Sequence, residues 1–157
     1  MDQIPVTKIG YDKLVAELHQ LKTVARPEVI ESIAVAREHG DLKENAEYHA
    51  AKEQQSFIEG RILELESVTG RAQIIDPTTL SGDTVKFSAT VTIVNEETDE
   101  EETYQIVGDY ESDMEKGKLS ISAPVARALI GKSEGDSVTV KTPKGAQDYE
   151  ILNVEYK

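Results

Sequence analysis

The sequence has no cysteine and no tryptophan, and aromatic residues make up only 5% of its 157 residues. Without cysteine the chain can form no disulfide, no thiolate metal site and no thiol nucleophile, which fits a reducing compartment. Long hydrophobic runs are also missing, because no apolar stretch approaches the ~18 residues that a membrane-spanning helix needs. The opening residues, MDQIPVTK, contain no signal-peptide core. We therefore expect a cytoplasmic protein with no membrane partner.

Positive charge is scarce as well. The chain has 17 lysines and arginines against 30 acids, and its net charge is -13. Residues 1–76 hold 9 basic and 14 acidic side chains, and residues 77–157 hold 8 and 16, so neither half is basic. A free-standing nucleic-acid binder usually carries a clear excess of positive charge. Bulk electrostatics would therefore repel this protein from free DNA.

The spacing of the apolar residues changes near Asp76, where a Pro-Thr-Thr segment follows. Before this point apolar residues recur at steps of three and four, which is typical of helices, and after it they alternate as in strands. We predict two domains, residues 1–76 and residues 77–157. The two patterns together indicate an α+β protein.

The first domain is expected to be an antiparallel helical hairpin. A coiled-coil stripe of apolar residues comes first, is interrupted at Pro27, and resumes one position out of the heptad, which predicts a kink or two abutting helices. A second stripe follows Gly40, and two narrow stripes joined by a short link must cover one another. The stripes consist of Tyr11, Leu14, Leu18, Leu21 and Ala25, then Val29, Ile30, Ile33 and Ala36, and finally Tyr48, Ala51, Gln55, Ile58, Ile62 and Leu65.

The second domain is expected to be a small, largely antiparallel sheet packed against one short helix. Alternation from Val85 to Ile93 predicts a strand, and an acidic loop follows at residues 96–102. Pro124 suits the first turn of a helix that Gly131 ends. Further strands are expected at residues 104–107, 119–122, 137–142 and 149–156.

Common catalytic motifs are not visible. Gly131-Lys132-Ser133 matches the end of a phosphate-binding loop, but Ala126 stands where that motif needs a glycine. The three histidines lack the spacing of a helical zinc site, and no Gly-x-Ser-x-Gly elbow is present.

The link between the two helices allows two interpretations. Asp41 could be the N-cap of the second helix, with Glu44 completing a capping box and Gly40 ending the first helix. Alternatively, Asp41 and Glu44 could project from the end of the hairpin to hold a magnesium ion. Since Mg²⁺ takes six ligands, the others would have to come from elsewhere, such as another protein's active site and its phosphate substrate.

Two long motifs carry a resemblance to a known family. Residues 36–55, AREHGDLKENAEYHAAKEQQ, resemble the tip signature of the bacterial Gre transcript cleavage factors. Residues 121–132, ISAPVARALIGK, resemble that family's carboxy-terminal signature, and IPVT at residues 4–7 extends the likeness to nearly the whole chain. The resemblance implies an amino-terminal antiparallel coiled coil and a carboxy-terminal domain of the FKBP-like fold.

The resemblance also implies a function. Members of the family bind bacterial RNA polymerase through the globular domain and insert the coiled coil into its secondary channel. They stimulate the polymerase's own cleavage of backtracked nascent RNA, so that arrested complexes resume elongation. The chain would then be an accessory factor and not an enzyme, and we expect a monomer.

Specific residues follow from the same resemblance. Asp41 and Glu44 would be the catalytic acids and would help to hold a second Mg²⁺ in the polymerase active site, an ion that the free factor does not bind stably. Arg37 and Lys52 would lie near the RNA 3′ end, although they also suit an ordinary helix surface. The inhibitory homologues carry extra acids at the tip, so the Asp-Leu-Lys-Glu form favours activation.

The polymerase-docking side would include Ser122, Pro124 and Arg127, together with the loop of residues 109–117. The same residues suit a helix start and a solvated loop equally well. Two rival functions stay open. One is prolyl isomerisation by the second domain, which its few aromatic residues disfavour. The other is a purely structural coiled-coil adaptor, in which Asp41 and Glu44 only cap a helix.

Overall fold

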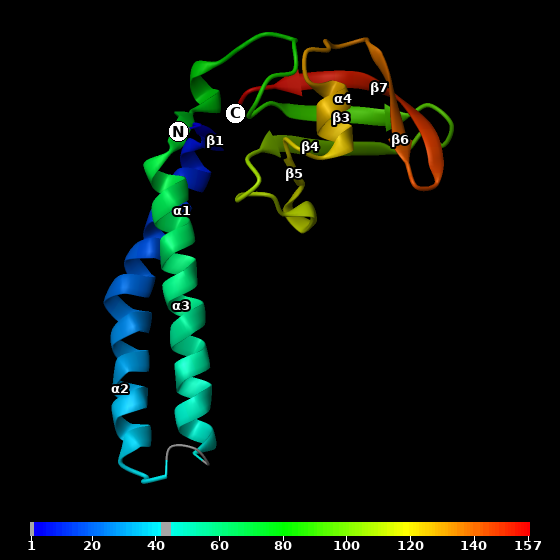
Figure 1. Cartoon of the computed structure of the whole chain (residues 1–157). Helices are drawn as coiled ribbons and strands as arrows, with labels where there is room; N and C mark the ends of the chain where they lie inside the picture. Colours follow the sequence, from blue (N-terminus) through cyan, green and yellow to red (C-terminus); the bar gives the residue numbers. More distant parts are fainter. Residues whose placement is uncertain (1, 42–44) are drawn as a thin grey trace. The chain divides into compact units, whose positions relative to one another are not determined.

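The computed structural model describes residues 2–41 and 45–157. Its contacts divide these residues into two compact units (Figure 1). One unit spans Tyr11–Arg71, and the other combines Asp2–Gly10 with Ala72–Lys157. The first residues of the chain therefore belong with its carboxy-terminal part. Among the described residues, no helix is both long and apolar enough to span a membrane.

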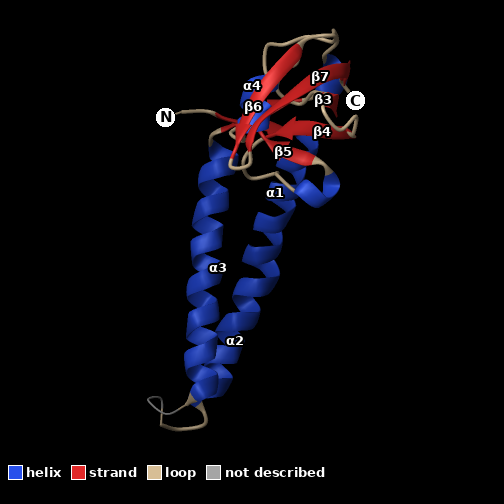
Figure 2. Ribbon diagram, turned by 90° about the vertical axis from the view of Figure 1, so that its right-hand side faces the viewer, coloured by secondary structure: helices blue, strands red, loops and turns tan. Residues whose placement is uncertain are grey.

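The first unit is the predicted antiparallel hairpin. Helix α1 (Lys8–Gln20) leads through a π-helical segment (Leu21–Ala25) into α2 (Arg26–Arg37), and α3 (Ala46–Gly70) returns alongside α2 (Figures 1 and 2). The two stripes face each other, and burial of a side chain such as Ile62 stabilises the pair by roughly 1.5–3 kcal/mol. Stripe residues that are buried are Leu14, Val29, Ile33, Ala36, Ala51, Ile58, Ile62 and Leu65. Ile30 was expected among them, but its side chain is 52% exposed.

The predicted irregularity at Pro27 takes the form of a π turn. Pro27 lies in the first turn of α2 and has no backbone N–H to donate to the preceding turn. The backbone N–H of Arg26 donates to the carbonyl oxygen of Leu21, one residue further back than in an α-helix. The wider turn therefore absorbs the proline without ending the helical path.

The second unit contains a five-stranded sheet in the order β5-β4-β3-β7-β6. Neighbouring strands are antiparallel except for the parallel pair β4–β5, so the sheet is largely antiparallel, as expected. Helix α4 (Pro124–Leu129) packs its buried Ala126 and Leu129 against the core of this sheet. The strands are β3 (Thr90–Asn95), β4 (Glu101–Val107), β5 (Lys118–Ser120), β6 (Ser137–Thr142) and β7 (Gly145–Glu155).

The strand predicted from Val85 to Ile93 is only half correct. Val85, Phe87 and Ala89 are buried as the alternation indicated, yet β3 begins at Thr90. Ser88 has a φ of +76°, and the N–H of Ala89 donates to the carbonyl of Lys86. The chain therefore turns here, and Ser88 is buried along with both of its neighbours, so burial does not alternate as it would in a strand.

A second sheet was not predicted at all. Strand β1 (Ile4–Thr7) pairs in parallel with β2 (Ala72–Ile75), although the helical pattern was taken to continue to residue 76. The acidic loop is also shorter than expected, because β4 starts at Glu101. The short helix ends as predicted, with Gly131 at a φ of +85° directly after its last turn. Two 3-10 turns, Pro77–Thr79 and Met114–Lys116, complete the unit.

Candidate functional site

The end of the hairpin is built on one asparagine. Asn45 is the N-cap of α3, since its Oδ1 accepts from the backbone N–H of Tyr48 at 3.0 Å. Its Nδ2 donates to the carbonyl oxygen of Ala36 in α2 at 2.6 Å. A single side chain therefore links the last turn of one helix to the first turn of the other.

The capping-box interpretation of Asp41 is wrong, because the helix starts four residues later than that interpretation requires. Asp41 lies in the exposed connection between the helices. Glu44, the second expected acid, lies outside the described residues, as do Leu42 and Lys43. Gly40 follows the last turn of α2 with a φ of +100°, as a helix-ending glycine should.

Asp41 lines a shallow hollow at this end together with His39, Asn45, Ala46 and Glu47. The Nε2 atom of His39 lies 3.4 Å from a carboxylate oxygen of Glu47, and both side chains are mostly exposed. Within residues 2–41 and 45–157, no group of three or more His, Asp or Glu side chains is arranged to hold a metal ion.

The two expected nucleic-acid contacts, Arg37 and Lys52, lie on the same groove of the hairpin. The groove has an apolar floor that includes Ile30 and Ile33. The guanidinium carbon of Arg37 lies 6.0 Å from the ring centre of Tyr48, within cation–π range. The Nζ atom of Lys52 donates to Gln55 at 3.2 Å. Two cations from different helices therefore border one exposed groove close to the tip.

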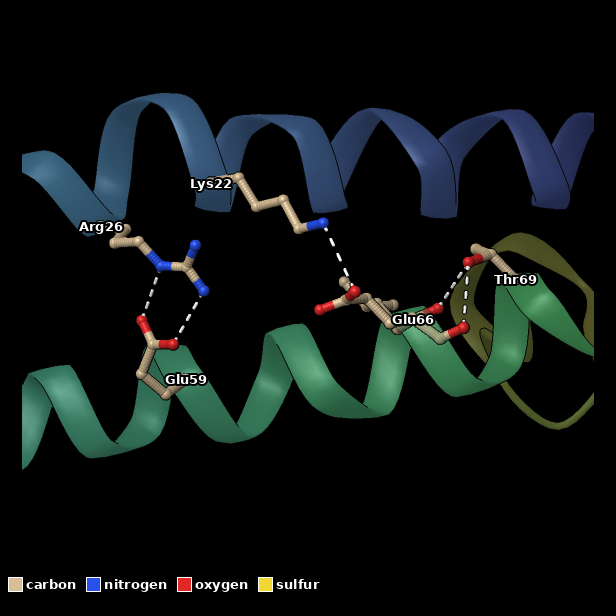
Figure 3. A network of polar contacts seen from close by, with 6 residues as sticks. Lys22, Arg26, Glu59, Glu66 and Thr69 are labelled. Atoms are coloured by element: carbon tan, nitrogen blue, oxygen red, sulfur yellow. Dashed lines mark hydrogen bonds and ion pairs between the residues drawn. The ribbon is translucent and has the colours of Figure 1, made fainter.

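Ion pairs link the two sides of the hairpin. The guanidinium of Arg26 in α2 donates two hydrogen bonds of 2.8 Å to the carboxylate of Glu59 in α3 (Figure 3). The Nζ atom of Lys22 lies 3.5 Å from a carboxylate oxygen of Glu66. Arg61 of α3 makes a second two-bonded contact, with Glu17, at 2.7 and 2.9 Å.

The two arginine contacts lower the pKa values of the two glutamates that they involve. The hydrogen bond from Arg26 lowers the pKa of Glu59, and the hydrogen bond from Arg61 lowers the pKa of Glu17. The sequence contains the residues but no signal that pairs them, because their partners lie 33 and 44 positions away.

One expected docking residue, Ser122, binds Asp109. The Oδ1 atom of Asp109 accepts from the hydroxyl of Ser122 at 2.6 Å and also from that of Ser120. The hydroxyl of Ser120, then that of Ser122, and the charge of Arg127 lower the pKa of Asp109. Pro124 occupies the first turn of α4. The structure therefore joins the first residue of the 109–117 loop to the segment just before α4, and this loop also exposes Tyr110 and Met114.

Comparison with known families covers both units. The family model described as "Transcription elongation factor, N-terminal" matches residues 4–74. The model described as "Transcription elongation factor, GreA/GreB, C-term" matches residues 80–156. The chain belongs to the GreA/GreB family of transcription elongation factors, which confirms the resemblance seen in the two motifs.

Individual proteins of known sequence or structure are also similar to this chain. The chain is 64% identical to "Transcription elongation factor GreA" of Ruegeria pomeroyi and 60% identical to the protein of that name from Paracoccus denitrificans, with 99% of each chain covered in both cases. The crystal structure of GreA factor homolog 1 from Thermus thermophilus matches with 26% identity and a TM-score of 0.45. That match covers 98% of this chain and 99% of the other.

Proposed function

We propose that this elongation factor binds bacterial RNA polymerase, inserts its helical hairpin into the secondary channel and stimulates cleavage of backtracked RNA. The observation that carries the proposal is the exposed position of Asp41 at the end of the hairpin. Its carboxylate lies in the exposed connection between α2 and α3, and Asn45 performs the capping task that would otherwise explain an acid there. Asp41 is therefore not the helix cap that the purely structural interpretation made it.

In this proposal Asp41 and Glu44 act on a catalytic centre that belongs to the polymerase. They would hold a second Mg²⁺ together with polymerase carboxylates and RNA phosphate, since this ion is usually bound by one or two carboxylates plus water and phosphate oxygens. The ion supplies stabilisation of the entering and leaving oxygens of the displacement. Asp41 would also orient the attacking water, so the factor has no turnover by itself.

The other predicted residues have supporting roles. Arg37 and Lys52 would contact the phosphates of the RNA 3′ segment, because both border the same exposed groove near the tip. Ser122, Pro124 and Arg127 would contact the polymerase. The hydrogen bonds of Ser122 and Ser120 to Asp109 support this, because they join the first residue of the loop to the segment just before α4 and so preform part of the surface.

The test uses stalled, backtracked elongation complexes in the presence of Mg²⁺. The double variant Asp41→Asn with Glu44→Gln should abolish stimulated cleavage and leave polymerase binding nearly unchanged. A matched control removes two acids from the exposed surfaces of α2 and α3, with Glu31→Gln and Glu53→Gln, and should cleave like the wild type. Cleavage that persists in the Asp41 and Glu44 variant would refute the role of the tip.

A further inference from the structure

We propose that Asn45 is a positioning residue for Asp41, and this inference rests on the function proposed above. Asn45 uses both ends of its amide, one on each helix. Its oxygen accepts from the N–H of Tyr48 in α3, and its nitrogen donates to the carbonyl of Ala36 in α2. The connection that carries Asp41 therefore begins and ends at points that one side chain holds together.

The hydrogen bond to Ala36 holds the end of α2 next to the start of α3. Ala36 is buried, with 2% of its surface exposed, and lies nine positions before Asn45 on the opposite helix. Its carbonyl also accepts from the backbone N–H of His39, so both lone pairs are used. Movement of either helix end would break a hydrogen bond in a half-buried place, where an unpaired donor or acceptor costs more than at the surface.

Two neighbouring contacts join the same helix ends but are weaker. The pair of His39 and Glu47 is mostly exposed, and exposed pairs contribute little. The stacking of Arg37 over Tyr48 is at the outer limit of its range. Of these three contacts, the one made by Asn45 joins the two helix ends in a half-buried place.

The choice of amino acid supports this assignment. Ser, Asp and Asn are about equally good N-caps, because each offers an oxygen to the first turn. Only asparagine among them also offers an amide donor that can reach the other helix. A role limited to capping would not need that donor. Cleavage chemistry would need it, because a shift of ~1 Å in a reacting group can reduce a rate ~100-fold.

The experiment separates the two roles with paired variants. Asn45→Ser and Asn45→Asp both keep the capping oxygen and both lose the donor to Ala36, and they differ in charge. Helix content by circular dichroism should stay close to the wild type because the cap is kept, and the thermal midpoint should fall slightly through loss of the one bond to Ala36. The maximal rate of stimulated cleavage at saturating factor should fall roughly 10- to 100-fold in both. The factor concentration that gives half of this rate should not change.

A second measurement reports position directly, without the polymerase. Because the chain has no cysteine, Asp41→Cys creates a single site for a nitroxide label. The label should move faster in the Asn45→Ser background than with Asn45 present, seen as narrower lines in the paramagnetic resonance spectrum. Identical spectra, or unchanged cleavage in both Asn45 variants, would overturn the proposal.

Failure of the two proposals can be told apart. Asp41→Asn is assayed in parallel with the Asn45 variants. If Asp41→Asn abolishes cleavage and the Asn45 variants cleave normally, only the positioning role is wrong. If Asp41→Asn itself cleaves normally, the proposed function fails at this tip, and the positioning role fails with it.

Discussion

The carboxylate of Glu111 binds Thr7 across 104 positions of sequence. Its Oε2 atom accepts from the backbone N–H of Thr7 at 3.0 Å and from the N–H of Gly108 at 2.9 Å, and its Oε1 atom accepts from the Thr7 hydroxyl. That hydroxyl also accepts from the backbone N–H of Gly10 at 3.0 Å, where α1 has just begun. One acid therefore holds the end of β1 against the sheet unit.

Removal of this acid should destabilise the sheet unit. Glu111→Ala leaves the two backbone donors without their acceptor in a half-buried place, and such a loss costs about 1–3 kcal/mol. The free energy of unfolding in urea measures the effect. Glu115→Ala, an exposed position in the same loop, is the control and should change stability little. Equal stability of the two variants would contradict this role of Glu111.

Two glycines should respond in opposite directions to an added methyl group. A Cβ at Gly108 would lie 2.4 Å from the carbonyl oxygen of Pro5, so strand β1 would have to move. Overpacking of this kind typically costs about 1–3 kcal/mol. Gly60 lies inside α3 with open space around it, and Gly60→Ala should stabilise the protein by about 0.4–1 kcal/mol. Thermal unfolding of both variants checks the pair, and a neutral Gly108→Ala would be the contrary result.

The hairpin should lose stability in acid through its ion pairs. The folded-state pKa values of Glu17 and Glu59 are lowered from 4.5, first of all by hydrogen bonds from Arg61 and Arg26. Their contribution is therefore present above pH 4.5 and is lost as the pH falls through the lowered pKa values. Glu59→Gln should be less stable than the wild type at neutral pH. The two stabilities should become similar once the pH is below the lowered pKa of Glu59.

Helical signal during denaturation, followed from about pH 7 to about pH 3, measures this difference. Glu31→Gln in α2 is the matched control, since Glu31 is exposed on the same helix. If the difference in stability between Glu59→Gln and the wild type stayed constant over the whole pH range, the charge of Glu59 would not be the cause of that difference.

Local patterns in the sequence predicted much of the fold. The apolar steps of three and four located nearly all buried positions of the hairpin, because one face of a long helix repeats many times. Residues 137–142 were predicted as a strand with the bounds that β6 has, and Gly131 ends α4 as expected. At these places neighbouring residues alone determine the backbone.

Distant contacts account for the predictions that failed. Strands β1 and β2 have four residues each, too few for a periodic signal, and they pair across the whole hairpin. The apolar residues from Val85 to Ala89 alternate in the sequence like a strand, but Ser88 turns the chain. One of the two interpretations of Asp41 was a helix cap, because its spacing to Glu44 matches a common motif. Asn45 is the actual cap, and its bond to Ala36 could not be read from local spacing.

Strands β1 and β2 pair in parallel and both belong to the second unit. The helical hairpin is therefore the crossover connection between two parallel strands. Its two ends are fixed at neighbouring strands, in register from Ile4 with Ala72 to Thr7 with Ile75. Adding or deleting whole heptads equally in both helices would leave that register unchanged. The length of both helices could thus change together, by natural variation or by engineering, without redesign of the sheet.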